Sequence, residues 1–264
     1  MLKSLYTTAT GMKAQQTMVD MIANNIANVN TAGFKKSQAS FEDLFYVTLQ
    51  SPGLARGVND SAVPIGTQIG SGTRLNGTTK VFSTGTLEIT ERNLDIAIDG
   101  EGFFAVTLAD GGTGYTRDGT FHVNNDGKVV TGQGYVLVPE ITVPQDFLEI
   151  SIDQQGRVTG RTAGNPDTAQ LFGQINITRF VNPSGLLSIG GNVLRQTDAS
   201  GPPLTSTPGS NGLGQLKQGF VERSNVQIVN ELVNLIVAQR AYEVNSRAIQ
   251  ASDQMLSTAT NLSR

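Results

Sequence analysis

The sequence predicts an α+β fold in which an all-β central domain is inserted between N- and C-terminal coiled-coil-like helices. Near both ends of the chain, apolar residues recur at every seventh position, which is typical of helices that pack lengthwise on other helices. Between the ends, short β-branched and aromatic runs alternate with Asp-Gly turns, which is typical of antiparallel strands joined by hairpins. We therefore expect the two ends to fold as helices and the centre to fold as strands.

The first helix is predicted over residues 2–30. Its seven-residue spacing consists of Leu5, Met12, Val19 and Ile26. Gly33 follows at a position where glycine commonly ends a helix, because glycine adopts left-handed backbone angles without steric cost. We therefore expect Gly33 to be the stop signal of this helix.

Asparagines are unusually frequent in the second half of this helix. Asparagine is unfavourable inside helices because its amide competes for backbone hydrogen bonds. We expect Asn24, Asn25 and Asn28 either to bond across helices or to be solvated polar positions near the helix end, and the sequence supports both interpretations.

An intermediate extended region is predicted over residues 31–80 together with residues 201–223. Inside it, the segment SFEDLFYVTLQ, residues 40–50, favours a short helix. Residues 51–72 and 199–214 are rich in Gly, Pro, Ser and Thr, and such segments are usually poor in regular structure. We expect this region to connect the helices to the β-domain.

The β-rich domain is predicted over residues 81–200. Its clearest part runs from residue 94 to residue 138, where apolar runs are separated by the turn sequences DGEG, DGG, RDG and NDG. Within this part, NNDGK, residues 124–128, is predicted to form a type I′ hairpin turn.

The second helix is predicted over residues 224–264, which form a terminal helical domain with residues 1–30. Ser224 is expected to cap this helix, and Gln227 to complete a capping box three residues later. Its seven-residue spacing consists of Ile228, Leu235, Tyr242, Ile249 and Leu256.

A second apolar stripe runs beside this spacing in the C-terminal helix. It is interleaved with small or polar residues such as Asn245 and Ser252, which let another backbone approach closely. The two stripes either form one broad face on the protein's own core or provide an extra face for neighbouring subunits. Arg240 lies close to them, where its guanidinium is either a solvated helix charge or a donor to another helix or subunit.

The composition excludes several classes of function. The chain has 19 basic and 22 acidic residues, a balance that favours neither nucleic acid nor an anionic membrane as a partner. It has no cysteine, which excludes disulfides, thiol catalysis and thiolate metal sites. No apolar run of signal-peptide length precedes Lys13, and no run approaches the ~18 residues that suggest a membrane span. We therefore expect neither a cleaved secretion signal nor a membrane-spanning segment.

No group of residues in the sequence points to catalysis. His122, the only histidine, lies on a predicted strand without identifiable partners, so a structural strand residue is favoured. Asp95, Asp99 and Glu101 share strand parity and would align on one face for acid–base chemistry, but a turn after Asp99 explains that carboxylate more simply. No phosphate-binding glycine loop is present. We therefore predict no enzyme activity, no cofactor and no metal site.

Three parts of the chain resemble one known protein family. NNIANVNTAGFKK, residues 24–36, resembles the N-terminal signature of the flagellar rod and hook family. SNVQIVNELVNLIVAQRAYEVNSRAIQASDQML, residues 224–256, resembles the C-terminal helix of that family, and the motifs LDIAIDGEGFFAV, YTRDGTF and GKVVTGQGYVL are similar to its central β-domain. The chain length and the segment LQSPGLARGVNDSAVPIGTQIGSG resemble a rod member rather than the longer hook protein.

The resemblance implies a structural subunit of the bacterial flagellum, located in the basal-body rod within the cell envelope and exported without a cleaved signal peptide. It implies helical polymerisation into a hollow drive shaft that transmits torque and conducts exported proteins. In such a tube the terminal helices form the inner wall and the β-domain faces outward, so Asn24, Asn25 and Asn28 would bond across helices or line the channel. The implied partners are further copies of the chain, proximal rod proteins, the hook protein, the flagellar export apparatus and, in bacteria with an outer membrane, the P and L ring proteins.

Three alternative interpretations are compatible with the sequence. The chain could be another rod or hook paralogue of the same family. It could be an oligomeric extracellular module that binds carbohydrate or peptidoglycan, because aromatic residues of the β-domain could stack on sugars, although such residues more often fill a core. It could also be a cell-wall hydrolase that uses one of the three carboxylates named above.

Overall fold

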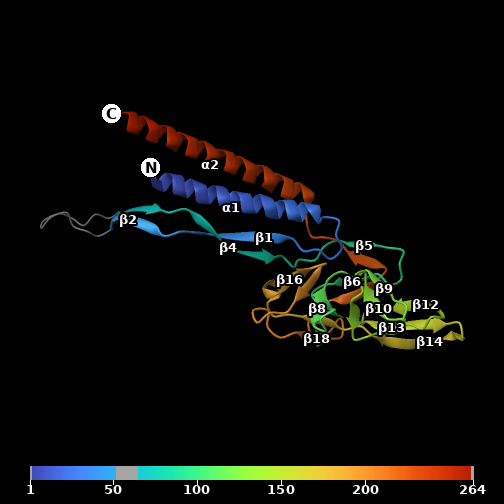
Figure 1. The fold of residues 1–264 in the computed structure, drawn as a ribbon. Helices are drawn as coiled ribbons and strands as arrows, with labels where there is room; N and C mark the ends of the chain where they lie inside the picture. The colour runs from blue at the N-terminus through green and yellow to red at the C-terminus, as the bar shows by residue number, and fades with distance from the viewer. Residues whose placement is uncertain (1, 52–64, 263–264) are drawn as a thin grey trace. The chain divides into compact units, whose positions relative to one another are not determined.

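The computed structural model describes residues 2–51 and 65–262. It confirms the α+β fold, because helices lie at the two ends of the chain and antiparallel strands form its centre (Figure 1). The chain divides into two compact units, which we describe separately. Unit 1 consists of Met1–Ile26, Ser37–Thr79 and Ile228–Arg264, and unit 2 consists of Ala27–Lys36 and Lys80–Gln227.

The two α-helices belong almost entirely to unit 1. The first, α1, spans Leu2–Ala27, and the second, α2, spans Ile228–Leu262. The predicted start of α2 at Ser224 is wrong, and with it the predicted capping box. Ser224 Oγ instead accepts a hydrogen bond from the backbone N–H of Val226 at 3.3 Å, which holds the chain in a local turn before the helix.

The helices α1 and α2 pack side by side in antiparallel directions (Figure 1). Near one end of the helix pair, the side-chain nitrogen of Asn25 on α1 donates a hydrogen bond to Glu231 Oε2 on α2 at 3.4 Å. Towards the other end, a Cβ atom on Gly11 would lie 3.1 Å from the Asn245 side-chain nitrogen. The two contacts are separated by the same number of residues on each helix, so the helices stay in register between them. The absence of a side chain on Gly11 therefore leaves room for the side chain of Asn245.

Unit 1 also contains a ribbon of strands. In it, β1 (Ser37–Asp43) pairs with β4 (Thr73–Lys80), and β2 (Tyr46–Gln50) pairs antiparallel with β3 (Thr67–Gly70). The short helix predicted over residues 40–50 is therefore wrong. Aromatic and β-branched residues in this segment favour strands, and partners on the distant strand β3 supply the ladder hydrogen bonds.

The loose segment predicted over residues 51–72 lies mostly outside the described residues, but its last part forms β3. The ribbon contacts α1, since Lys3 Nζ donates to the carbonyl of Ile69 at 2.8 Å and the Thr73 N–H donates to Thr10 Oγ1 at 3.4 Å. Within unit 1, α1 therefore contacts both α2 and the ribbon.

Unit 2 is built from short strands and one 3-10 helix. In chain order these are β5 (Leu87–Ile89), β6 (Ile96–Asp99), β7 (Phe103–Thr107), β8 (Thr113–Thr116), β9 (Phe121–Val123), β10 (Val129–Thr131), β11 (Val136–Val138), β12 (Phe147–Ile152), β13 (Arg157–Thr162), β14 (Asn165–Gln174), β15 (Ile177–Arg179), the 3-10 helix Pro183–Gly185, β16 (Leu187–Gly190), β17 (Val193–Arg195), β18 (Leu204–Ser206), β19 (Gln215–Gln218) and β20 (Phe220–Glu222). Residues 199–214, predicted to be poor in regular structure, contain one short strand, β18.

The largest sheet of unit 2 has the strand order β16–β17–β8–β7–β11–β10–β9, and β15 joins it by pairing with β7 and β18. The strands β12, β13 and β14 form a second sheet, and β6–β19 and β5–β20 form separate pairs. Phe104 and Phe121, both 0% exposed, meet edge to face in the main core with their ring centroids 5.1 Å apart. The aromatic side chains of these strands therefore fill a core.

The loop between β9 and β10 differs from the predicted type I′ turn. Strand pairing stops at Val123 and Val129, and within the loop only Gly127 has a positive φ, +78°. Asn124 Oδ1 accepts hydrogen bonds from the N–H groups of Asp126 and Lys128 at 3.0 and 2.9 Å. The asparagine side chain thus organises a longer loop, because it supplies an acceptor that a two-residue turn does not need.

Gly33 has the left-handed backbone angles that the sequence predicts, with φ of +67°, but for a different reason. It lies beyond the end of α1, and its N–H donates to the carbonyl of Glu222 at 2.8 Å. A Cβ atom at this position would lie 2.5 Å from the backbone nitrogen of Asp118. Glycine is required here because the chain packs directly against another backbone, and not because it caps the helix.

We predict that Gly33→Ala lowers the free energy of unfolding by about 2 kcal/mol or more, because it combines a left-handed alanine with a backbone clash. The matched control is Gly132→Ala, where a Cβ atom would meet nothing within 4 Å and the backbone is not left-handed. Urea denaturation of the two variants measures the difference. Equal stabilities would contradict the close approach at Gly33.

Candidate assembly surface and buried ionic junction

On α1, the residues with the predicted seven-residue spacing are only partly buried. Leu5, Met12, Val19 and Ile26 are all half-buried. The fully buried side chains of this helix are Ala14, Ile22 and Asn25. The spacing therefore marks the flank of the buried face and leaves part of each apolar side chain accessible.

On α2, the residues with the predicted seven-residue spacing differ in how far they are buried. Leu235, Ile249 and Leu256 are half-buried, whereas Ile228 and Tyr242 are exposed. Arg240 is also exposed, and its guanidinium forms an ion pair with Glu243 one turn along the same helix at 3.5 Å. An exposed pair of this kind adds little stability.

A second set of apolar side chains on α2 is solvent-exposed in the single chain, and we call it the α2 stripe. Its exposures range from 45% for Leu232 to 72% for Val229. At 3.6 residues per turn, most of these positions lie on the side of α2 opposite the fully buried Ala238. The members of the α2 stripe are Val229, Leu232, Val233, Ile236, Val237 and Val244. Large exposed apolar patches often mark sites of protein association, which makes the α2 stripe the candidate assembly surface.

Asn25 bonds across the two helices inside the chain. It is 3% exposed, and its amide donates to the Ser37 carbonyl at 3.0 Å and to Glu231 Oε2 at 3.4 Å. Its Oδ1 accepts from the Ser37 N–H at 2.9 Å. Asn24 is exposed, and Asn28 is half-buried and accepts from the Thr31 hydroxyl. The three asparagines therefore differ in burial, and the Asn25 amide joins α1 to both α2 and β1.

A buried ionic cluster in unit 2 is centred on Glu222, which is 1% exposed. Lys35 Nζ lies 2.6 Å from Glu222 Oε1, and Arg117 Nη1 lies 3.3 Å from Glu222 Oε2. The N–H of Gly85 also donates to Glu222 Oε1 at 2.8 Å. The Glu222 carboxylate therefore balances the charge of two buried cations and also accepts a hydrogen bond from a backbone N–H.

Asn225 extends this cluster into a junction of three chain segments. Its Oδ1 accepts from the Lys36 N–H at 2.8 Å, and its amide nitrogen donates to the Val81 carbonyl at 2.8 Å and to Ser83. Ser83 also accepts from Lys35 Nζ at 2.7 Å. We use the term junction for residues 33–36, 81–85 and 222–225. Each of these segments lies within a few residues of a point where the chain leaves unit 2.

Three cations near the junction, Lys35, Arg117 and Lys80, lie in surroundings whose low polarity disfavours their charged forms. Burial lowers the pKa of Lys35, and the attraction of Glu222 opposes this shift without cancelling it. Burial lowers the pKa of Arg117 in the same way. The pKa of Lys80 is lowered by burial alone. Arg117 Nε is buried and finds no acceptor among the described residues. Positive charge is therefore only partly compensated here.

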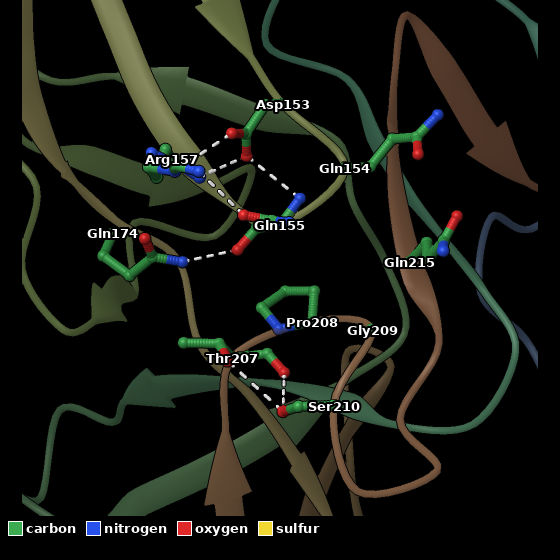
Figure 2. A pocket seen from close by; sticks show the side chains of 10 residues that line it. All are labelled: Asp153, Gln154, Gln155, Arg157, Gln174, Thr207, Pro208, Gly209, Ser210 and Gln215. Carbon is green, nitrogen blue, oxygen red and sulfur yellow. Dashed lines mark hydrogen bonds and ion pairs between the residues drawn. The ribbon is translucent and has the colours of Figure 1, made fainter.

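Unit 2 also contains an open cleft of about 810 Å³, which Figure 2 shows with its lining side chains. Asp153 forms an ion pair with Arg157 at 3.2 Å and accepts from the N–H of Gln155. Gln174 donates to the backbone carbonyl of Gln155, whereas the side chains of Gln154 and Gln215 point away from these bonds (Figure 2). The two charged residues that line the cleft, Asp153 and Arg157, are paired with each other, and its amide and hydroxyl groups can offer hydrogen bonds to a polar molecule.

The residues considered for catalysis are placed in different environments. Asp95 is buried and pairs with Arg92 at 3.7 Å. Asp99 is exposed and pairs with Lys217 at 2.7 Å. Glu101 is also exposed and pairs with Arg179 at 3.6 Å. His122 is exposed on β9. Within residues 2–51 and 65–262, no three His, Cys, Asp or Glu side chains are grouped to hold a metal ion.

Sequence reasoning did not identify Lys35, Arg117 and Glu222. Two of them lie inside motifs that carried the family resemblance, GFKK and YTRDGTF. Glu222 is 187 residues from Lys35 and 105 from Arg117. The available signal was the presence of charged residues next to apolar ones at the ends of predicted elements, but the sequence does not show which charges meet.

The fold and these surfaces define a class of protein. The chain pairs its terminal helices, has a β-rich unit between them in the sequence and exposes an apolar stripe along one helix. These are the features of a structural subunit that associates with other chains. No helix in the described part of the chain is both long and apolar enough to cross a membrane.

Comparison with known proteins identifies the family. Three family models match the chain. Residues 5–35 match "Flagella basal body rod protein" and residues 97–160 match "Flagellar hook protein FlgE/F/G D1 domain". Residues 217–262 match "Flagellar basal body rod FlgEFG protein C-terminal". The chain belongs to the flagellar basal-body rod and hook family, which confirms the resemblance seen in its motifs.

Full-length relatives agree with this assignment. The chain is 46% identical over 266 residues to the flagellar basal-body rod protein FlgG of Borreliella burgdorferi, and the match covers 100% of both chains. It is 42% identical over 261 residues to FlgG of Caulobacter vibrioides, covering 99% of both chains. It is also 42% identical over 273 residues to FlgG of Bacillus subtilis, covering 100% of both chains.

We predict that Glu222→Gln lowers the free energy of unfolding by about 3 kcal/mol or more, because it leaves two buried cations without their carboxylate. The control is Glu88→Gln, which removes the surface partner of Arg223 and should change stability little. Urea denaturation of the full chain measures both effects. Equal effects would show that the buried cluster contributes no more than a surface ion pair.

A pH dependence follows from the lowered pKa of Lys80. Between this lowered value and the ordinary value of 10.5, the unfolded chain binds more protons than the folded chain, so the Lys80 contribution to stability increases as pH rises through this window. We expect Lys80→Met to be more stable than the natural chain at neutral pH, with a difference that shrinks as pH approaches 10.5.

Lys128→Met is the control for this experiment, because a hydrogen bond with Glu140 raises the pKa of Lys128. A raised pKa gives a contribution that is fully present at every pH below 10.5 and declines only above it. Unfolding free energies measured from pH 7 to pH 10.5 should therefore show the trend for Lys80→Met alone. The same trend in both variants would contradict the assignment to Lys80.

Proposed function

We propose that this chain is the structural subunit of the flagellar distal rod, and that it polymerises helically into a hollow drive shaft. The observation that carries the proposal is the α2 stripe, an apolar helix surface that the single chain leaves exposed. The relatives named flagellar basal-body rod protein FlgG, which align over the full chain, support it. The proposed shaft transmits torque and conducts exported proteins.

A polymer follows from the kind of surface that is exposed. When one surface of a subunit complements a different surface of the next identical copy, the result is a ring if the rotation closes and an open helix if it does not. The α2 stripe and the exposed side chains of the ribbon, such as Phe45 and Leu49, are two such different surfaces. A rod requires the open helix.

We assign the helices to the inner wall of this tube. In this proposal, residues 1–30 and 224–264 form the inner layer, residues 31–80 and 201–223 an intermediate layer, and residues 81–200 the outer layer. The proposed polymer interface includes the residues with seven-residue spacing, together with Arg240 and the asparagines Asn24 and Asn28. Those with seven-residue spacing are Leu5, Met12, Val19, Ile26, Ile228, Leu235, Tyr242, Ile249 and Leu256.

The junction has a mechanical role in this proposal. A drive shaft transmits torque only if the force on one part of a subunit reaches its other part without unfolding the connection. The junction ties three connecting segments with charged and amide hydrogen bonds that are largely withdrawn from water. Such bonds are stronger and less screened than surface ion pairs.

The partners and location follow from membership of the rod. We propose that the subunit contacts further copies of itself, proximal rod proteins and the hook protein, and the P and L rings where an outer membrane is present. We also propose that it leaves the cell through the flagellar export apparatus without a cleaved signal peptide. Its role is non-enzymatic, since the carboxylates considered for hydrolysis are paired with separate basic residues.

We predict that Ile236→Asp blocks rod assembly while the single chain remains folded. Ile236 is 57% exposed, so a charge there should change the free energy of unfolding by no more than about 0.5 kcal/mol. In the polymer the same charge would be buried in an apolar contact, where an unpaired carboxylate is strongly unfavourable. Electron microscopy of basal bodies from the source bacterium, with the variant as its only copy, measures assembly.

The control for this experiment is Asn234→Asp, which introduces the same charge on nearly the opposite side of α2. We expect this variant to assemble. Normal rods built from Ile236→Asp would show that the α2 stripe is not a polymer interface, and absence of the natural chain from basal bodies would overturn the proposed function itself.

A further inference from the structure

A pocket of about 210 Å³ lies beside the junction in unit 2. Apolar and aromatic side chains and the cations of the junction region line it together. The hairpin between β16 and β17 borders it. The residues that matter for its chemistry are Phe34, Lys35, Lys80, Phe82, Arg117 and Asn192. Neither the family resemblance nor the proposed interface accounts for this pocket.

Its charge is unbalanced. Lys35, Lys80 and Arg117 line the pocket, and Glu222 is the one carboxylate that contacts any of them among the described residues. Glu101 acts on Arg117 from the surface, where it already pairs with Arg179. The pocket therefore has an excess of positive charge.

Lys80 is the cation best placed to receive a ligand. Its ammonium lies 4.9 Å from the centre of the Phe34 ring and donates to the Lys35 carbonyl at 3.3 Å. In residues 2–51 and 65–262 it forms no ion pair. An ammonium has three donors, so this group retains the capacity to bind an acceptor. It is half-buried, where a charge-assisted hydrogen bond is stronger than in water.

We propose that this pocket binds the carboxylate of an acidic side chain from a second copy of the chain, with the Lys80 ammonium as its principal contact. The aromatic rings suit the methylene stem of such a side chain, which a free inorganic anion lacks. A second copy is the favoured source because acidic residues outnumber basic ones, 22 to 19, and exposed carboxylates such as Asp20 and Asp43 form no ion pair within the described part of their own chain. The inference rests on the proposed function, which supplies the second copy.

The first experiment titrates the purified full-length chain with propionate at constant ionic strength and follows the lysine side-chain signals by NMR. We expect saturable binding that shifts the Lys80 signal and is at least about tenfold weaker in Lys80→Met, as expected for loss of one charge-assisted hydrogen bond. Lys217→Met is the control, because it removes an equal charge from outside the pocket, where Lys217 pairs with Asp99. It should bind propionate as the natural chain does.

Two results of this titration would overturn the proposal. Either propionate causes no saturable shift at Lys80, or inorganic phosphate binds more tightly than propionate, which would make the pocket a site for a free anion. Because Lys80→Met should be stable at neutral pH, its loss of binding would not reflect unfolding.

The second experiment tests the source of the carboxylate. Isolated basal bodies are treated with a carbodiimide, which joins a lysine to a carboxylate only when the two are in contact, and cross-linked peptides are identified by mass spectrometry. We expect Lys80 to be joined to an acidic residue of another copy. Intact rods without a cross-link from Lys80 between copies would overturn the inference and leave the proposed function standing. Absence of the chain from the rods would overturn the proposed function, while the propionate result would still report on the pocket.

Discussion

The buried carboxylate of Glu222 is the interaction on which the rest of the structure depends. Removing charged groups from water costs several kcal/mol for each ion, and this cost is offset only when good geometry and extra hydrogen bonds satisfy the buried charges. Glu222 meets this condition because its oxygens receive Lys35, Arg117 and the N–H of Gly85. These donors come from separate parts of the chain, so satisfying one carboxylate also fixes where the chain enters and leaves unit 2.

Unit 1 is organised by a different constraint, the close approach of two long helices. Gly11 leaves room for the Asn245 side chain of the other helix, and the Asn25 amide is hydrogen-bonded to both α2 and β1. A single helix pair buries only one side of each helix, and the α2 stripe remains exposed. Assembly therefore adds what the single chain lacks, because most of the stability of a helix comes from packing of its apolar surface.

The features that weaken the isolated subunit are those that suit a polymer. The α2 stripe exposes apolar surface, and the half-buried Lys80 has no ion-pair partner in the described part of the chain. Neither feature stabilises the single chain, and both gain partners if other copies approach. Proteins commonly break local rules of stability at functional sites and compensate elsewhere, and here the compensation comes from the aromatic core of unit 2 and the Glu222 cluster.

The sequence by itself determined the fold class, the two helices and the β-rich centre, because seven-residue spacing and Asp-Gly turns are local patterns that a chain expresses wherever it folds. It also determined the family, through motifs at both ends. Local patterns failed at residues 40–50, where distant partners make strands of a segment that favoured a helix, and at Ser224, where a local turn precedes α2. Only the tertiary structure decided that Gly33 packs against Asp118, that Asn25 meets Glu231, and that Lys35 and Arg117 share Glu222. These contacts join residues far apart in the chain, and a sequence states which charges and glycines exist but not which of them folding brings together.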